Sequence, residues 1–229
     1  MVAFSSKLIL YMKKHFFASL VMMSLSTMLL YPGSVSSQSV VADSLAYLKP
    51  FVGKYQFTDN KMVFLQIMIK DGHMVLKQLW DKQEIPFTKT SELEFYNDEH
   101  HFPLKFTKSN TGEITQVLAF NRDQWNRVAD DYSPPMKKVI HLPDEQLKIF
   151  SGRYELKGGD GDADDIADVT VSDGHLVIQH EKDITPLLPV SELEFVTEDQ
   201  SFDVVFTKAA DGSITQGVIN NRDVWIKDK

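Results

Sequence analysis

Ser91 to Trp125 reads SELEFYNDEHHFPLKFTKSNTGEITQVLAFNRDQW, and Ser191 to Trp225 reads SELEFVTEDQSFDVVFTKAADGSITQGVINNRDVW. The two stretches agree at 17 of 35 positions, with a constant offset of 100 residues and no gap. A unit of this length that occurs twice predicts two domains with the same fold.

The residues around these stretches alternate as β-strands do. In Val63–Ile69 every second residue is Val, Leu or Ile, and Asp71-Gly72 then provides a tight hairpin turn. Short alternating segments separated by turn residues continue to the end of each copy, about seven strands per copy. The sequence therefore predicts an all-β protein of two tandem antiparallel meanders, small barrels or half-barrels, each preceded by a short helix (Asp43–Phe51 and Pro143–Phe150).

The same pattern divides the chain into four parts. Residues 1–37 are predicted to be a signal peptide, 38–126 the first barrel repeat, 127–141 a linker with two adjacent prolines, and 142–229 the second repeat. A single repeat of this size without disulfides would be only marginally stable. We therefore expect the two repeats to pack against each other.

The first 37 residues determine the expected location. Basic residues precede the uncharged apolar run Phe16–Tyr31, and a small-residue segment follows it, with a cleavage site near Ser37/Gln38. The alternative is a retained anchor, but the run has 16 residues, short of the roughly 20 that a spanning helix needs. The sequence thus predicts a periplasmic or secreted protein with no stable membrane span after cleavage, held together without any cysteine.

The charge excludes some classes of partner. Residues 1–37 contain three lysines and no acid, so the remainder has 21 basic and 32 acidic residues and a formal charge of −11. Nucleic acids and anionic lipids are bound by clustered Lys and Arg. The sequence therefore predicts no nucleic-acid partner.

The most specific repeated motif is Asn-Arg-Asp-x-Trp, which ends each copy. It makes Arg122, Arg222, Trp125 and Trp225 candidate ligand-binding residues, because a guanidinium can bind a carboxylate or phosphate. The alternative is structural: each Arg stacks on its Trp and pairs with a repeated glutamate, Glu94 or Glu194. Strand alternation also predicts that an Arg and the Asp after it face opposite ways and do not pair.

Copy one is the more apolar of the two. Phe64, Met68 and Phe120 correspond to Ile166, Thr170 and Asn220, and Trp80 has no tryptophan counterpart. Such a face is either a ligand surface, which makes Phe64 and Trp80 further candidates, or the contact between the copies, which we favour.

No catalytic or cofactor motif is present. The serine-hydrolase motifs G-x-S-x-G, S-x-x-K and K-T-G are absent, as is H-E-x-x-H. Asp160, Asp162 and Asp164 are candidate Ca²⁺ ligands in an acidic insertion, but the closing glutamate of a calcium loop is missing. An acidic solvated loop is the preferred interpretation, and the sequence predicts no metal, no cofactor and no catalytic residue.

Three short motifs carry a family resemblance: L-x-x-F-x-G-x-Y, the D-G-H turn and F-x-x-x-F-T-K…G-x-I-T-Q. Through them, Leu48–Trp125 and Leu147–Trp225 each resemble the lipocalin-like β-barrel domain found C-terminal to serine hydrolases of the β-lactamase and penicillin-binding-protein type. The resemblance implies an accessory barrel that covers or organises a hydrolase, or holds a ligand. The hydrolase domain itself is missing, so no catalytic residue is carried over.

These observations together predict an exported, non-catalytic binding or accessory module of the cell envelope. Its partner would be an envelope protein such as a serine hydrolase, or a wall-derived ligand. One alternative is a carrier of a small apolar molecule, which needs a cavity of roughly several hundred cubic ångströms inside a barrel. The other alternative is a hydrolase with an unrecognised site.

Overall fold

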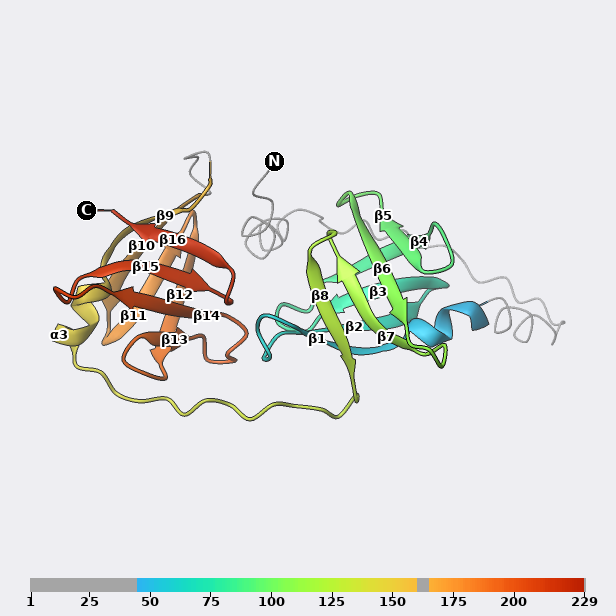
Figure 1. Ribbon diagram of the computed structural model, residues 1–229, viewed down its shortest axis with the longest axis horizontal. Coiled ribbons are helices and arrows are strands. Elements are labelled where there is room, and N and C mark those ends of the chain that lie inside the picture. Colours follow the sequence, from blue (N-terminus) through green and yellow to red (C-terminus); the bar gives the residue numbers. More distant parts are fainter. Residues whose placement is uncertain (1–44, 160–164, 229) are drawn as a thin grey trace, which may run out of the picture.

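The computed structural model describes residues 45–159 and 165–228, which form two closed eight-stranded antiparallel barrels in tandem (Figure 1). The predicted all-β tandem architecture is confirmed, in its closed form and with eight strands per copy rather than about seven. The proposed signal peptide and its cleavage site lie outside the described residues.

Each barrel is a simple meander in which the first strand also pairs with the last. The strands of barrel 1 are β1 (Gly53–Phe57), β2 (Phe64–Lys70), β3 (His73–Gln78), β4 (Glu84–Lys89), β5 (Glu94–Asn97), β6 (Phe102–Lys108), β7 (Ile114–Ala119) and β8 (Asp123–Val128). The strands of barrel 2 are β9 (Gly152–Leu156), β10 (Ile166–Ser172), β11 (His175–His180), β12 (Asp183–Pro189), β13 (Glu194–Val196), β14 (Asp203–Lys208), β15 (Ile214–Ile219) and β16 (Asp223–Lys227).

Alternation along the strands fills each barrel with side chains. In β6, Phe102, Leu104 and Phe106 are buried while Lys105 between them is exposed. Phe106 meets Phe51 and Phe95 edge to face. In barrel 2 the equivalent Phe206 meets Phe195 edge to face and packs on Phe150 at a tilted angle. The interiors are therefore packed cores rather than open ligand chambers.

A short helix precedes each barrel and is fixed by a tyrosine. The 3-10 helix η1 (Ala46–Phe51) leads into barrel 1, and α3 (Asp144–Leu147) with the 3-10 helix η2 (Lys148–Phe150) leads into barrel 2. The buried hydroxyl of Tyr55 donates to the carbonyl of Phe51, and that of Tyr154 donates to the carbonyl of Phe150, both at 2.7 Å. Burial raises the pKa of Tyr55 to about 12 and raises the pKa of Tyr154 as well.

The segment between Val128 and Asp144 runs extended along both barrels (Figure 1). On barrel 1 the Tyr132 carbonyl accepts a hydrogen bond from Lys54 at 2.6 Å, and the Tyr132 ring meets Phe64 edge to face. On barrel 2 the buried side-chain amide of Gln200 bonds both the N–H and the carbonyl of Lys137, at 2.8 and 2.9 Å. The linker is thus attached to barrel 1 at Tyr132 and to barrel 2 at Lys137.

Within these described residues, none of the helices has the length and apolar character needed to cross a membrane.

Candidate functional site

The Asn-Arg-Asp motifs of the two barrels meet at the junction between them. Arg222 Nη1 donates to Asp123 Oδ1 at 2.5 Å, and Arg122 Nη2 lies 3.4 Å from Asp223 Oδ1. Each barrel therefore gives an arginine to the other's aspartate, as two subunits do across a two-fold axis. The duplicated motif therefore forms part of the contact between the two barrels.

The geometry of the turns explains how these side chains reach across. Phe120 and Asn121 both have positive φ, 54° and 55°, and the Arg122 N–H closes the turn on the Ala119 carbonyl at 3.0 Å. Two consecutive residues of this kind form the tight turn that suits a hairpin. Asn220 and Asn221 repeat it in barrel 2, with φ of 48° and 55°. Each arginine therefore projects from a hairpin tip.

Three details expected of the arginines are wrong. Arg122 Nε lies 3.5 Å from Asp123 Oδ1, although alternation predicted that neighbours would not pair; Arg122 belongs to the turn, where alternation does not hold. The glutamates also have other partners: Glu94 pairs with Lys105, and Glu194 with Lys137. Arg222 lies over the ring of Phe57, 4.8 Å from its centroid, rather than over its own tryptophan.

The junction is an electrostatic network with more acids than bases. Asp59 joins it, with Oδ2 3.8 Å from Arg222 Nε, so three carboxylates face two guanidiniums. Burial raises the pKa of Asp123 and Asp223 above the ordinary range, against the lowering effect of both arginines. Burial, and then the positive charge of Arg222, lowers the pKa of Arg122.

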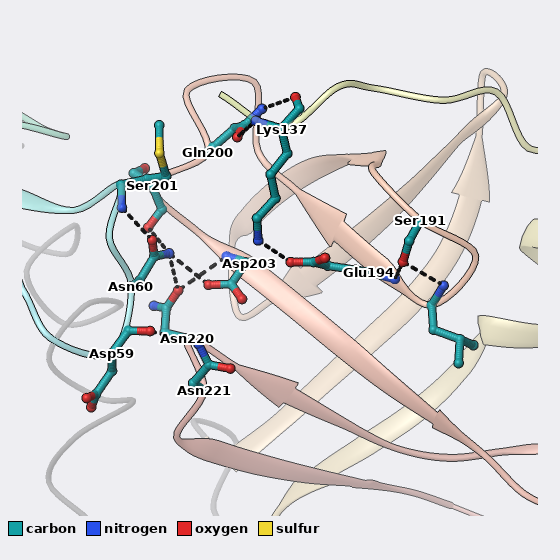
Figure 2. Close-up of polar contacts among 12 residues, drawn as sticks. Asp59, Asn60, Lys137, Ser191, Glu194, Gln200, Ser201, Asp203, Asn220 and Asn221 are labelled. Atoms are coloured by element: carbon teal, nitrogen blue, oxygen red, sulfur yellow. Dashed lines mark hydrogen bonds and ion pairs between the residues drawn. The ribbon is translucent and has the colours of Figure 1, made fainter. Parts of the chain in front are cut away.

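A loop of barrel 1 also contacts barrel 2 through Asn60 (Figure 2). Asn60, which precedes β2, donates from Nδ2 to Asp203 Oδ1 at 2.8 Å and to Asn220 Oδ1 at 3.0 Å. Its own Oδ1 accepts from the Met62 N–H at 2.8 Å, which fixes the loop. Asn60, Asp203 and Asn220 are only 6%, 5% and 2% exposed, so this is a buried polar contact between the barrels.

Asp203 is a buried carboxyl group with a raised pKa. Burial raises its pKa to about 6, only partly opposed by the positive charge of Lys137, and the negative charge of Glu194 raises it further. Its hydrogen-bond donor from barrel 1 is the neutral amide of Asn60 rather than a cation. A carboxyl group that titrates near neutrality therefore lies in the contact between the barrels.

An apolar pocket opens at the mouth of barrel 1, directly under Arg222. Its volume is about 40 Å³, and its wall is predominantly hydrophobic. Among the residues that line it are Phe57, Leu65, Trp80, Phe102, Phe120 and Trp125, with Asp123 and Arg222 as the charged members. The pocket thus belongs to both barrels, because barrel 2 supplies Arg222.

Aromatic rings build the walls of this pocket. Trp80 and Trp125 stack with an interplanar angle of 9° and centroids 6.2 Å apart, and Phe57 packs on Trp125 at 4.8 Å. Phe120 packs on Phe102 at 3.8 Å despite its positive φ, a backbone conformation that costs energy for a bulky residue. A strained residue in the wall of a pocket is typical of functional sites.

Barrel 2 lacks the same walls. The tryptophan Trp80 lies in the turn between β3 and β4, residues 79–83, whereas the equivalent turn between β11 and β12 is Glu181–Lys182. The register of the strands places Leu156 at the position of Phe57, and Asn220 takes the place of Phe120. Asn220 is used to bind Asn60. The two barrels have therefore diverged at their mouths, one apolar and one polar.

The structure brings together three of the six residues predicted to bind ligand: Arg222, Trp80 and Trp125 all line the pocket. Arg122 lies in the ionic network beside it. Trp225 is buried in the core of barrel 2, where it meets His180 edge to face. These placements leave their roles in ligand binding as predictions.

Phe64 lies elsewhere. It is 9% exposed, covered by the Tyr132 ring and by Lys54, whose Nζ is 4.5 Å from its centroid. The linker covers Phe64 while Trp80 lines the pocket, so these two residues do not form one continuous surface.

Sequence reasoning missed Asn60 and Asp203. Neither residue recurs in the other copy: Asp203 corresponds to Pro103, and Asn60 precedes a strand in an unremarkable loop. The available signal was the change from Phe120 to Asn220, because a polar residue at a barrel mouth needs a partner.

Within residues 45–159 and 165–228 no group of three or more His, Asp or Glu side chains is arranged to hold a metal ion. The candidate calcium ligands Asp160, Asp162 and Asp164 lie outside the described residues. A search of protein-family models and of curated proteins finds no match to the chain.

Proposed function

We propose that the protein is an exported, non-catalytic binding module of the cell envelope whose site is the aromatic pocket at the mouth of barrel 1. One observation carries the proposal: stacked Trp80 and Trp125 form an apolar pocket at a barrel mouth, with a charged pair at its rim. Small-molecule and peptide sites combine these features, an apolar wall and a few polar groups that fix orientation.

The size of the pocket determines what it can accept. At about 40 Å³ it has room for a few heavy atoms, whereas pockets that enclose a whole drug-sized ligand have roughly 300–1,000 Å³. The bound part is therefore a small apolar end group of something larger that remains outside. This favours a protein partner or a wall-derived ligand over the alternative, a carrier that encloses a small apolar molecule.

The charged rim favours a neutral end group. Asp123 and Arg222 already neutralise each other at 2.5 Å, and Arg222 is only 16% exposed. A charged ligand would have to displace one member of this pair, which leaves the other buried and unpaired. The resemblance to accessory domains of serine hydrolases makes an envelope hydrolase a partner worth testing first.

Native mass spectrometry of the chain purified from its own host tests the proposal. Wild type is compared with Trp80→Ala and with Lys182→Ala, a control in the equivalent turn of barrel 2. We expect a bound species, a ligand of a few hundred daltons or a stoichiometric protein, in wild type and in the control but not in Trp80→Ala. A bare mass in wild type, or a species retained by Trp80→Ala, contradicts the proposal.

A further inference from the structure

The linker between the barrels is exposed along almost its whole length (Figure 1). Residues 129–143 contain no helix or strand, and from 131 to 141 all residues are exposed except Pro134, which is half-buried. Even the apolar side chains of Met136 and Val139 are 59% and 43% exposed. The segment is therefore accessible to another protein.

Only a few contacts fix the backbone of this segment. Gln200 binds the N–H and the carbonyl of Lys137, and the Ile140 N–H donates to a carbonyl of β12 at 2.9 Å. Between these points, the backbone groups of Lys138 and Val139 have no hydrogen-bond partner among the described residues. An extended segment with unpaired N–H and C=O groups can pair with another protein as an added strand. The active site of an endoprotease can bind a segment in this form.

The two adjacent lysines of the linker differ in their side chains. The ammonium group of Lys137 is bonded to Glu194. Lys138 is exposed, and within the part of the chain that the structure describes its side chain takes part in no hydrogen bond or ion pair. A trypsin-like protease recognises a basic side chain that enters its specificity pocket. Lys138 can enter such a pocket directly, whereas Lys137 must first leave Glu194.

Exposure alone does not make a cleavage site. Lys182 is exposed as well, but it lies in the two-residue turn between β11 and β12, where Glu181 has a φ of 52°. A tight turn of this kind must open locally before it can pair as an extended strand, and local opening costs free energy. The bond after Lys138 is already in an extended segment.

We propose that the linker is a processing site at which a trypsin-like endoprotease cuts between Lys138 and Val139 and so separates the two barrels. The C–N bond of this peptide breaks, and water supplies the hydroxyl group of the new Lys138 carboxyl group and a hydrogen to the new Val139 amine. The inference rests on the proposed function only in what the cut controls, which is the pocket at the mouth of barrel 1.

The cut affects the pocket because the pocket belongs to both barrels. Arg222 of barrel 2 lines it and lies over the ring of Phe57. In the intact chain the junction is an intramolecular contact, but after the cut it must join two separate pieces, which costs translational and rotational freedom. Lys137 stays with barrel 1, so its bonds to Gln200 and Glu194 also become contacts between the pieces. When barrel 2 dissociates, the pocket loses Arg222 from its rim.

Limited trypsin digestion of the full chain, with mass spectrometry of the fragments, tests the site. Within residues 45–228 we expect the first cut to leave a C-terminus at Lys138 and an N-terminus at Val139. Lys138→Gln should slow the first cut by at least about tenfold, because the other sites require local opening. Lys182→Gln, the control, should leave the rate unchanged. A first cut at another bond, or an equal rate in Lys138→Gln, overturns the proposal.

Light scattering of the cut chain tests the consequence. On dilution to about 1 µM, where weak contacts between separate proteins are open, we expect two pieces of about half the mass of the chain. Lys138→Gln treated with trypsin for the same time should remain a single species. A cut chain that stays together at this concentration overturns the proposal.

The outcomes separate the processing site from the proposed function. Neither measurement involves a ligand, so failure of either leaves the Trp80-dependent binding test unaffected. A chain that is cut and separates as expected, but binds nothing when intact, supports the processing site and removes the proposed function. If the intact chain binds and the separated barrel 1 keeps the bound species, the cut does not control the pocket and this part of the proposal is overturned.

Discussion

Arg222 of barrel 2 and Asp123 of barrel 1 are 2.5 Å apart, whereas their repeat equivalents Arg122 and Asp223 are 3.4 Å apart. The shorter pair is also the more buried: Arg222 is 16% exposed and Arg122 37%. The two pairs therefore consist of equivalent residues but differ in distance and in burial.

Alanine substitutions should reveal this asymmetry. We expect Arg222→Ala to lower the free energy of unfolding by about 2 kcal/mol, since it leaves Asp123 buried without its main partner. Arg122→Ala should cost less than about 1 kcal/mol, the range of exposed pairs. Urea denaturation followed by circular dichroism measures both. Equal losses would mean that the two pairs are equivalent in solution.

Stability should depend on the ionisation of Asp203. Its pKa is raised in the folded protein, so the folded state binds the proton more tightly than the unfolded state. Its contribution is unfavourable above pH 6 and is relieved as the pH falls through 6 toward 3.8. From pH 7 to pH 5, wild type should gain about 1 kcal/mol relative to Asp203→Asn. A constant difference between the two proteins in this range would contradict the raised pKa.

The two tyrosine hydroxyls should make equal contributions. Tyr55→Phe leaves the Phe51 carbonyl buried without its donor, and Tyr154→Phe does the same to Phe150. Each substitution should lower the free energy of unfolding by about 1–3 kcal/mol. Thermal unfolding of the two variants beside wild type measures the effect, and a neutral result in either would show that water replaces the hydroxyl group.

Phe120→Asn converts the apolar mouth of barrel 1 to the residue used in barrel 2. Asparagine tolerates positive φ, so relief of backbone strain should offset part of the lost packing on Phe102. We expect the unfolding free energy to change by less than about 2 kcal/mol while ligand binding is lost. Retained binding would place the ligand away from this wall.

Phe64→Ala separates a structural residue from the pocket. Phe64 supports Tyr132 and Lys54 rather than the site, so its truncation should cost about 3 kcal/mol. Binding measured by native mass spectrometry below the unfolding midpoint should be unchanged. If binding falls with stability intact, Phe64 belongs to the ligand surface after all.

Local patterns predicted most of the fold. Asp71-Gly72 and the alternation in Val63–Ile69 depend only on neighbouring residues, and a 35-residue repeat carries the same fold to the second copy. Closure of each barrel depends on β1 pairing with β8, contacts more than 60 residues apart that no local pattern encodes. The sequence therefore favoured barrels without excluding half-barrels.

The site was harder to predict than the fold. The motif arginines and tryptophans were noticeable because they recur in both copies, and Trp80 because the second copy lacks it. Three of these residues, Trp80, Trp125 and Arg222, line the pocket. The polar contact of Asn60 with Asp203 joins residues 143 positions apart that have no repeat partner. Both side chains are buried only because the two barrels are docked, so neither sequence segment alone predicts the contact.

The two attachment points of the linker have a consequence for the strength of the junction. Tyr132 is held on barrel 1 and Lys137 on barrel 2, so only Ser133–Met136 is free, and two of these four residues are prolines. A tether this short and stiff keeps the barrels at a millimolar effective concentration of each other. At that concentration, contacts too weak to join two separate proteins are sufficient to hold the two barrels together.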